Sequence, residues 1–170
     1  MDNEKDLAKR KSTRLNHYDY SSLGAYFITI CTEGRQKILS QIVGDDVPGV
    51  PKNVELLPCG KIADKYINQF NEFYDHISVD WYVIMPNHIH ILLLVRENGS
   101  PRTSTPTRQT SAVSHFVSTF KRFCNKEYGR NVWQRGFYDH IIRGRDDYDK
   151  IMKYIHENPI NWYFDELYEK

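Results

Sequence analysis

Cysteine is scarce in this sequence, and long hydrophobic runs are absent. The three cysteines among 170 residues, Cys31, Cys59 and Cys124, lie far apart and form no CxxC pair. This pattern supports neither a disulfide framework nor a cysteine zinc site, and it fits a reducing compartment. The first residues lack the apolar stretch of a signal peptide, and no apolar run reaches membrane-spanning length. We therefore expect a cytoplasmic protein with no membrane segment.

Net charge is also small, at +1, which argues against a uniformly basic nucleic-acid-binding surface. The charges are unevenly distributed, however. Residues 113–145 hold seven basic residues against two acidic ones, whereas residues 146–170 hold seven acidic residues against three lysines. A basic segment of this kind can mark a surface that binds a polyanion, although a solvated surface is the more common explanation.

The hydrophobic pattern predicts an α+β protein with a single domain over residues 21–164. Strands are expected from β-branched and aromatic runs, and helices from apolar residues at helical spacing. The expected strands are 25–32, 77–84, 88–95 and 137–143, with a short one around 37–43, and the expected helices are 60–73, 113–129 and 146–158. The remaining segments are a basic arm over 1–20, a loop over 44–58, a flexible link over 97–112 and a C-terminal tail over 165–170. Together these elements predict a two-layer sandwich with an antiparallel sheet of about four to five strands.

A pair of histidines, His88 and His90, lies on the returning strand of a predicted hairpin that turns at Pro86 and Asn87. Successive strand residues point to opposite faces, so both imidazoles lie on one face and could converge on a metal ion or a phosphate. The alternative is a partly buried pair that hydrogen bonds to the backbone or to solvent.

The last predicted helix offers a second candidate site. Its apolar stripe places Tyr154 and Asn158 side by side at one edge, at the boundary between core and solvent. A helix can present a reactive hydroxyl and an amide oxygen from such an edge. A structural reading also applies, because tyrosines commonly lie at core edges and an asparagine before Pro159 is an ordinary way to end a helix.

Three segments together resemble the single-tyrosine HUH transposases, named for their histidine–hydrophobic–histidine motif, a group that includes the REP-associated tyrosine transposases. The segments are 85–91 with the histidine motif, 133–140, and 154–159 with the tyrosine. The resemblance covers residues from about 25 to about 162. Some members of the family carry glutamine four residues after the tyrosine, where this chain carries Asn158.

The resemblance implies a ferredoxin-like sheet with helices packed on one face, and a metal-dependent nuclease and strand transferase acting on single-stranded or hairpin DNA. It makes His88, His90 and Asn158 metal ligands and Tyr154 the nucleophile. Attack by a tyrosine oxygen on a DNA phosphate forms a 5′-phosphotyrosine and releases a 3′-hydroxyl. The implied ion is Mg²⁺ or Mn²⁺, and imidazole ligands favour Mn²⁺.

Basic residues are the candidate DNA contacts, because Lys and Arg side chains neutralise phosphates. These candidates are Arg14, Lys121, Arg122, Lys126, Arg130 and Arg135. For His140, beside Asp139 on the last expected strand, we favour a structural hydrogen bond over a role as a further ligand.

Three other functions remain open at this point. An HUH nickase of the replication-initiator or relaxase type would use the same residues. A non-catalytic module could bind single-stranded nucleic acid on the same sandwich. A simple metal-dependent hydrolase would form no covalent intermediate. The sequence also leaves open whether the protein is a monomer or a homodimer.

Overall fold

The computed structural model describes residues 23–44, 53–74, 76–96 and 111–168. The expected arm over residues 1–20, including Arg14, lies outside the described residues. Most of the expected link over 97–112 also lies outside them, although Ala112 already begins a helix.

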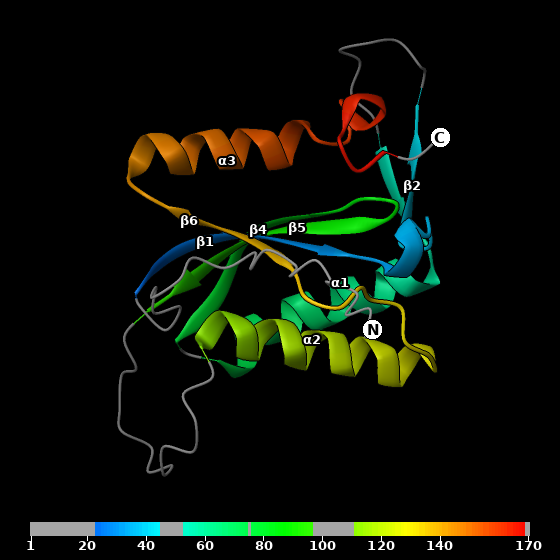
Figure 1. Cartoon of the computed structure of the whole chain (residues 1–170), viewed down its shortest axis with the longest axis horizontal. Coiled ribbons are helices and arrows are strands. Elements are labelled where there is room, and N and C mark those ends of the chain that lie inside the picture. The colour runs from blue at the N-terminus through cyan, green and yellow to red at the C-terminus, as the bar shows by residue number, and fades with distance from the viewer. Residues whose placement is uncertain (1–22, 45–52, 75, 97–110, 169–170) are drawn as a thin grey trace, which may run out of the picture.

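A four-stranded antiparallel sheet forms the centre of the fold (Figure 1). Its strands, in spatial order, are β4 (Ile77–Ile84), β5 (His88–Val95), β1 (Gly24–Cys31) and β6 (Tyr138–Ile142). Helix α1 (Pro58–Phe73) precedes β4, and helix α2 (Ala112–Tyr128) precedes β6. This βαββαβ order is ferredoxin-like. The predicted α+β class with an antiparallel sheet is confirmed.

One face of this sheet packs against α1 and α2 (Figure 1). Because side chains alternate along a strand, Tyr26, Ile28 and Ile30 of β1 point to this face together with Ile89 and Ile91 of β5. All five side chains are fully buried in the main hydrophobic core. The same alternation directs the residues between them, including both histidines of the pair, to the other face.

The ends of α2 follow from local chemistry. The Ser111 side chain accepts a hydrogen bond from the backbone N–H of Ser114, which satisfies one free donor of the first turn. Gly129 ends the helix with a φ of 84°, a left-handed conformation that glycine adopts without strain. The helix thus ends within one residue of the expected range 113–129.

Helix α3 (Arg145–Glu157) lies over the opposite face of the sheet (Figure 1). The expectation that helices pack on one face thus holds for α1 and α2, whereas α3 covers the other. An apolar stripe shows that a helix buries one side, but it does not say which face of the sheet that side meets. The Tyr148 hydroxyl donates to Asp80 of β4, and this bond ties α3 to the sheet edge.

A second, smaller sheet pairs β2 (Ser40–Val43) with β3 (Asn53–Leu56). The prediction of a loop over residues 44–58 was wrong at β3. Two prolines flank this short strand closely in sequence, and pairing with β2 supplies the backbone hydrogen bonds that its own pattern does not reveal. Two short 3₁₀ helices complete the described elements, η1 (Glu33–Arg35) and η2 (Trp162–Phe164).

Candidate functional site

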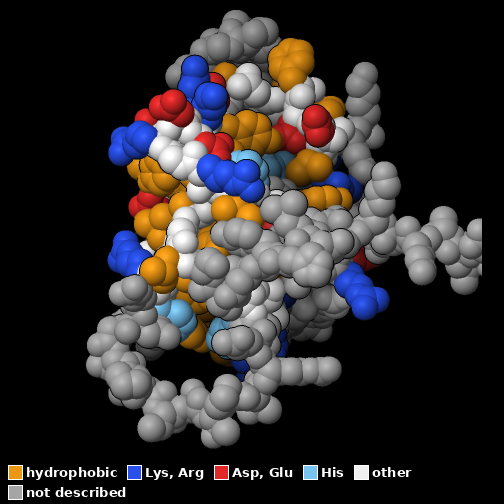
Figure 2. Space-filling model, turned by 60° about the vertical axis from the view of Figure 1, so that its left-hand side comes forward, with side chains coloured by type: hydrophobic (Ala, Val, Ile, Leu, Met, Phe, Trp, Pro, Cys, Tyr) orange, Lys and Arg blue, Asp and Glu red, His pale blue; other side chains and the backbone are white. Residues whose placement is uncertain are grey.

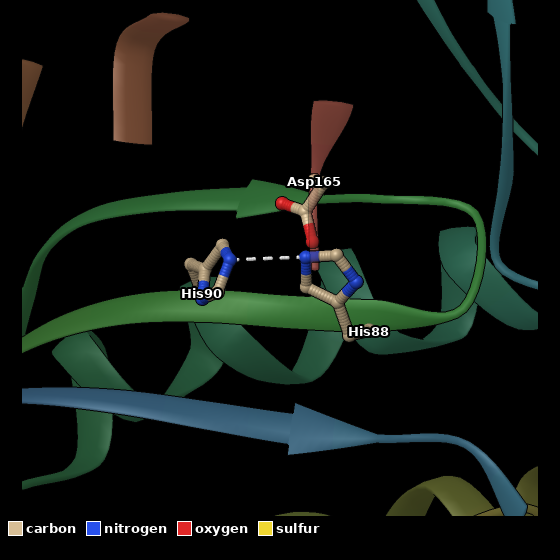
Figure 3. Close-up of side chains that lie close together, drawn as sticks. All are labelled: His88, His90 and Asp165. Atoms are coloured by element: carbon tan, nitrogen blue, oxygen red, sulfur yellow. Dashed lines mark hydrogen bonds between the residues drawn. The ribbon is translucent and has the colours of Figure 1, made fainter. Parts of the chain in front are cut away.

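The two histidines of β5 face each other on the side of the sheet that α3 covers. His88 is fully buried and His90 is 2% exposed. Their Nε2 atoms are 3.0 Å apart (Figure 3). Two nitrogen atoms bound to one ion at about 2.1 Å lie roughly 3 Å apart when the two bonds meet at a right angle. The spacing therefore fits two ligands of a single divalent ion.

The other ring nitrogen of each histidine is held by a neighbour. His88 Nδ1 lies 2.8 Å from Asn87 Oδ1, and His90 Nδ1 lies 2.8 Å from Thr29 Oγ1 on β1. The ring of Phe27 stacks on that of His90, with centroids 5.0 Å apart. Because an amide oxygen only accepts, His88 carries its proton on Nδ1 and directs the Nε2 lone pair toward His90. Contacts of this kind orient the imidazoles that bind metals.

Burial keeps both imidazoles neutral. It lowers the pKa of His88 to about 3, with a further contribution from the nearby Arg35 guanidinium. It also lowers the pKa of His90 well below its usual value, and the neighbouring His88 adds to the effect. A neutral imidazole is the form that binds metal ions, so the pair offers two nitrogen lone pairs at neutral pH.

Tyr154 reaches this pair from α3 of the same chain. Its hydroxyl lies 3.4 Å from His90 Nε2 and 3.4 Å from Asp165 Oδ2. The side chain is 44% exposed, so it is open to a bound molecule. Partial burial, followed by the charge of the Asp165 carboxylate, raises the Tyr154 pKa to about 12. The hydroxyl therefore keeps its proton at neutral pH in the protein alone.

Asn158 lies on the same side of α3 and is 3% exposed. Its Nδ2 donates to Asp165 Oδ2 at 2.8 Å. Its Oδ1 is buried and has no hydrogen-bond partner among the described residues. The structure thus brings together the four residues that the sequence singled out, His88, His90, Tyr154 and Asn158.

Asp165 is the residue of this site that the sequence analysis missed, because it was assigned to the C-terminal tail. It follows η2, and one of its carboxylate oxygens forms a cluster with a ring nitrogen of His88 and of His90 in which all three atoms lie within 4.8 Å of one another (Figure 3). The sequence shows Asp165 only as one acidic residue shortly after the helix that carries Tyr154, which does not single it out. Two neutral nitrogens, a carboxylate oxygen and the unpaired Asn158 oxygen fit a divalent metal ion.

A cleft of about 630 Å³ opens beside Tyr154. It lies between the sheet and α3, and its lining includes Phe27, Arg35, Tyr138 and Ile151. Tyr138 is 50% exposed. The cleft therefore combines aromatic surface with a cationic side chain next to the histidine pair.

The basic residues predicted to contact DNA are not gathered in this cleft. Arg122, Lys126 and Arg130 are exposed on α2 or just after it, in the layer on the other side of the sheet. Arg135 is exposed in the segment before β6. On the face drawn in Figure 2, basic side chains are separated by acidic and hydrophobic ones. DNA binding by these residues stays a prediction.

The Lys121 side chain is held by hydrogen bonds within the protein. Its ammonium group donates to the backbone oxygens of Gln134, at 2.7 Å, and Gly136. Burial lowers its pKa to about 8. A DNA phosphate would have to compete with these carbonyls for the ammonium group.

His140 lies away from the histidine pair, with its Nε2 2.9 Å from Asp147 Oδ2 in the first turn of α3. Asp147 also accepts from the backbone N–H of Arg143, and these two bonds lower its pKa. The contact ties β6 to the start of α3, in line with the structural hydrogen bond expected for His140. Helix α3 begins at Arg145, one residue before the expected start at 146, and Gly144 precedes it without a side-chain cap.

The chain is similar to several known proteins. The family model described as "Transposase IS200 like" matches residues 20–158. An uncharacterised protein of Haemophilus influenzae is 32% identical over 94% of this chain and 93% of its own length. A second H. influenzae protein, provisionally named a REP-associated tyrosine transposase, is 24% identical over 84% of this chain and 73% of its own.

A solved REP-associated tyrosine transposase bound to a REP hairpin superposes with a TM-score of 0.60. It is 17% identical, and the match covers 90% of this chain and 77% of that one. At this identity the likeness is one of fold.

The ferredoxin-like sheet, with a histidine pair facing a helix-borne tyrosine, defines a single-tyrosine HUH protein of the transposase class. The family match covers most of the chain. The chain belongs to the IS200-like transposase family, whose members are enzymes that cleave and transfer DNA strands. Among the described residues, no helix has the length and apolar character needed to cross a bilayer.

Proposed function

We propose that the protein is a metal-dependent single-stranded DNA endonuclease and strand transferase that uses Tyr154 as its nucleophile at hairpin-flanked sites. The observation that carries this proposal is the position of the Tyr154 hydroxyl, 3.4 Å from His90 Nε2 within one chain. A hydroxyl beside two neutral imidazoles is where a nucleophile and a metal-bound phosphate would meet. The groups proposed to react thus all come from one chain.

The histidines and Tyr154 have different roles in the proposed reaction. His88 and His90, together with an oxygen donor, would hold Mg²⁺ or Mn²⁺. The bound ion would neutralise charge on the scissile phosphate. The Tyr154 oxygen attacks the phosphorus and gives up its proton, and the bond from phosphorus to the 3′-oxygen breaks. The departing 3′-oxygen takes up one proton and ends as a hydroxyl, so the proton lost by Tyr154 balances the one gained by the leaving group. The product is a 5′-phosphotyrosine. Attack on it by another 3′-hydroxyl re-forms a phosphodiester and frees the tyrosine, which is strand transfer.

The cleft supports a single strand as the substrate. Its exposed tyrosine, Tyr138, can stack on an unpaired base, and Arg35 can pair with a phosphate. A cleft between α3 and the sheet exposes the nucleophile to a flexible strand more readily than to a rigid duplex. The hairpin is proposed from the relative that binds a REP hairpin, and we propose that Arg122, Lys126, Arg130 and Arg135 contact it outside the cleft. We also propose Arg14 as a DNA contact.

Cleavage of hairpin-flanked oligonucleotides tests the proposal. With Mn²⁺, the wild-type protein should release a 3′-hydroxyl product and leave the other fragment attached to protein on a denaturing gel. Tyr154→Phe should abolish both products, while Tyr163→Phe, a matched change at a similarly exposed tyrosine, should retain them.

The other functions predict different outcomes. A simple hydrolase would cleave without any protein-linked fragment. A binding module would retain the oligonucleotide without cutting it. A nickase of the replication-initiator or relaxase type would cleave sites that lack a hairpin. Any of these results would overturn the corresponding part of the proposal.

A further inference from the structure

We propose that Asp165 supplies the oxygen ligand of the metal centre and that Asn158 is a positioning residue for its carboxylate. This inference rests on the proposed function, because it concerns the same ion. Its basis is the cluster of ligand atoms from His88, His90 and Asp165, which all lie within 4.8 Å of one another. Figure 3 shows the carboxylate approaching the histidines from the C-terminal segment.

Hydrogen bonds fix the Asp165 carboxylate in place. Its Oδ1 accepts from the backbone N–H of Leu167 at 2.6 Å. Its Oδ2 accepts from Asn158 Nδ2 at 2.8 Å and from the Tyr154 hydroxyl at 3.4 Å. A carboxylate has about four lone-pair sites, so these three bonds leave one for an ion. A ligand held in this way needs little reordering when the ion binds.

The segment that carries Asp165 is itself attached to the histidine hairpin. The Asn87 Nδ2 donates to the backbone oxygen of Leu167 at 2.8 Å, while the Asn87 Oδ1 contacts His88 Nδ1. The residue before the histidine motif therefore positions both the first histidine and the segment that follows Asp165. Such a double contact couples the C-terminal segment to the metal site.

The orientation of Asn158 points to a positioning role. Its amide nitrogen faces Asp165, and a protonated amide nitrogen has no lone pair for a metal. If the amide were rotated by half a turn, Asn158 Oδ1 would lie at about the same 2.8 Å from Asp165 Oδ2. Two acceptor oxygens with no hydrogen between them repel each other, so this orientation is unfavourable. Asn158 Oδ1, which is buried with no partner among the described residues, is the competing oxygen donor, and we prefer Asp165 because its carboxylate is charged and lies in the cluster of ligand atoms with both histidines.

The chemical consequence is a centre with two imidazoles and one carboxylate. This set suits Mn²⁺ and other first-row ions better than Mg²⁺, which prefers oxygen ligands. Three protein ligands also leave positions for a phosphate oxygen. The negative charge of Asp165 adds attraction for the cation that an amide cannot supply.

Direct Mn²⁺ binding to the full chain, measured by calorimetry without DNA, tests the role of Asp165. Asp165→Asn should weaken Mn²⁺ binding about tenfold or more. Glu166→Gln removes the adjacent carboxylate, which is exposed and outside the cluster, and should leave the affinity unchanged. If Asp165→Asn binds as the wild type does while His90→Ala does not bind, Asp165 is not a ligand and the proposed function stands. Failure of the wild type to bind any divalent ion would remove both proposals.

The visible spectrum of bound Co²⁺ separates a ligand from a positioning residue. At saturating Co²⁺, Asp165→Asn should change the spectrum, because the set of donor atoms changes. Asn158→Ala should need more Co²⁺ yet reach the wild-type spectrum, because all three ligands remain. The reverse pattern, with the spectrum altered only in Asn158→Ala, would assign the oxygen ligand to Asn158. Circular dichroism of each variant confirms that the comparison is made between folded proteins.

Discussion

His88 and His90 direct their Nε2 atoms toward each other at 3.0 Å, while their Nδ1 atoms bond to Asn87 and Thr29. The two rings are thus fixed by Asn87 in the turn between β4 and β5 and by Thr29 on β1. Because the Thr29 hydroxyl can donate to His90 Nδ1, His90 can carry its proton on Nε2 and donate it to His88 Nε2 when no cation binds, and a bound cation would replace that proton.

Thr29→Val should weaken metal binding without removing a ligand. The substitution deletes the hydroxyl that holds His90 Nδ1 and preserves side-chain shape. Loss of such a supporting bond typically lowers metal affinity by about 10- to 100-fold. Calorimetry with Mn²⁺ measures the effect.

Thr119→Val is the matched control for this change. Thr119 is as buried as Thr29, at 6% exposure, but it lies on α2. Its substitution should leave the Mn²⁺ affinity unchanged. Equal losses in both variants would mean that Thr29 acts on general stability and not on His90.

Acid should destabilise the metal-free protein. In the unfolded chain His88 takes up a proton near pH 6.5, whereas burial lowers its folded pKa to about 3. Between these values the unfolded state binds more protons, so the free energy of unfolding falls as pH falls. The largest slope is about 1.4 kcal/mol per pH unit for each such histidine.

Urea unfolding in EDTA at several pH values between 4 and 7, spaced at roughly one unit, measures this slope. His88→Gln should reduce the slope, since glutamine does not titrate. Parallel slopes in the wild type and the variant would show that His88 does not remain neutral in the folded protein.

Lys121→Met should destabilise the fold. The variant leaves the carbonyl oxygens of Gln134 and Gly136 without their donor, which costs about 1–3 kcal/mol in the free energy of unfolding. Lys126→Met, at an exposed position on the same helix, should change it by less than about 0.5 kcal/mol. Equal stability of the two variants in urea would argue that Lys121 is free to bind DNA phosphates.

Arg35→Gln should weaken binding of an unstructured single strand. Arg35 lines the cleft beside Tyr154, so its loss removes one phosphate contact and reduces the salt dependence of binding by about one unit of slope. Arg122→Gln, on the opposite layer, should leave the affinity for the same strand unchanged. Fluorescence anisotropy at several salt concentrations makes the comparison, and a larger effect of Arg122→Gln would place the strand outside the cleft.

The sequence predicted much of this site because its parts are local. Strand alternation places His88 and His90 on one face, and helical spacing brings Tyr154 beside Asn158. The register that sets Thr29 opposite His90 depends on pairing between β1 and β5, which are about 60 residues apart. No local pattern reveals such a pairing.

The parts that sequence reasoning missed depend on tertiary contacts. Asp165 reaches the histidines because the chain turns back after η2, where Asn158 and Leu167 bond to its carboxylate. Lys121 has the pattern of a surface cation, and only the loop that folds over it buries it. Charge and spacing alone therefore could not separate a cation that binds the backbone from one that is free to bind DNA.

Mapping the covalent adduct tests the central claim most directly. The protein is incubated with Mn²⁺ and a hairpin-flanked single strand, digested with nuclease and protease, and analysed by mass spectrometry for a nucleotide-bearing peptide. We predict that the 5′-phosphate is attached to Tyr154 in the peptide from α3. Attachment to another residue, or strand cleavage with no adduct, would contradict the account.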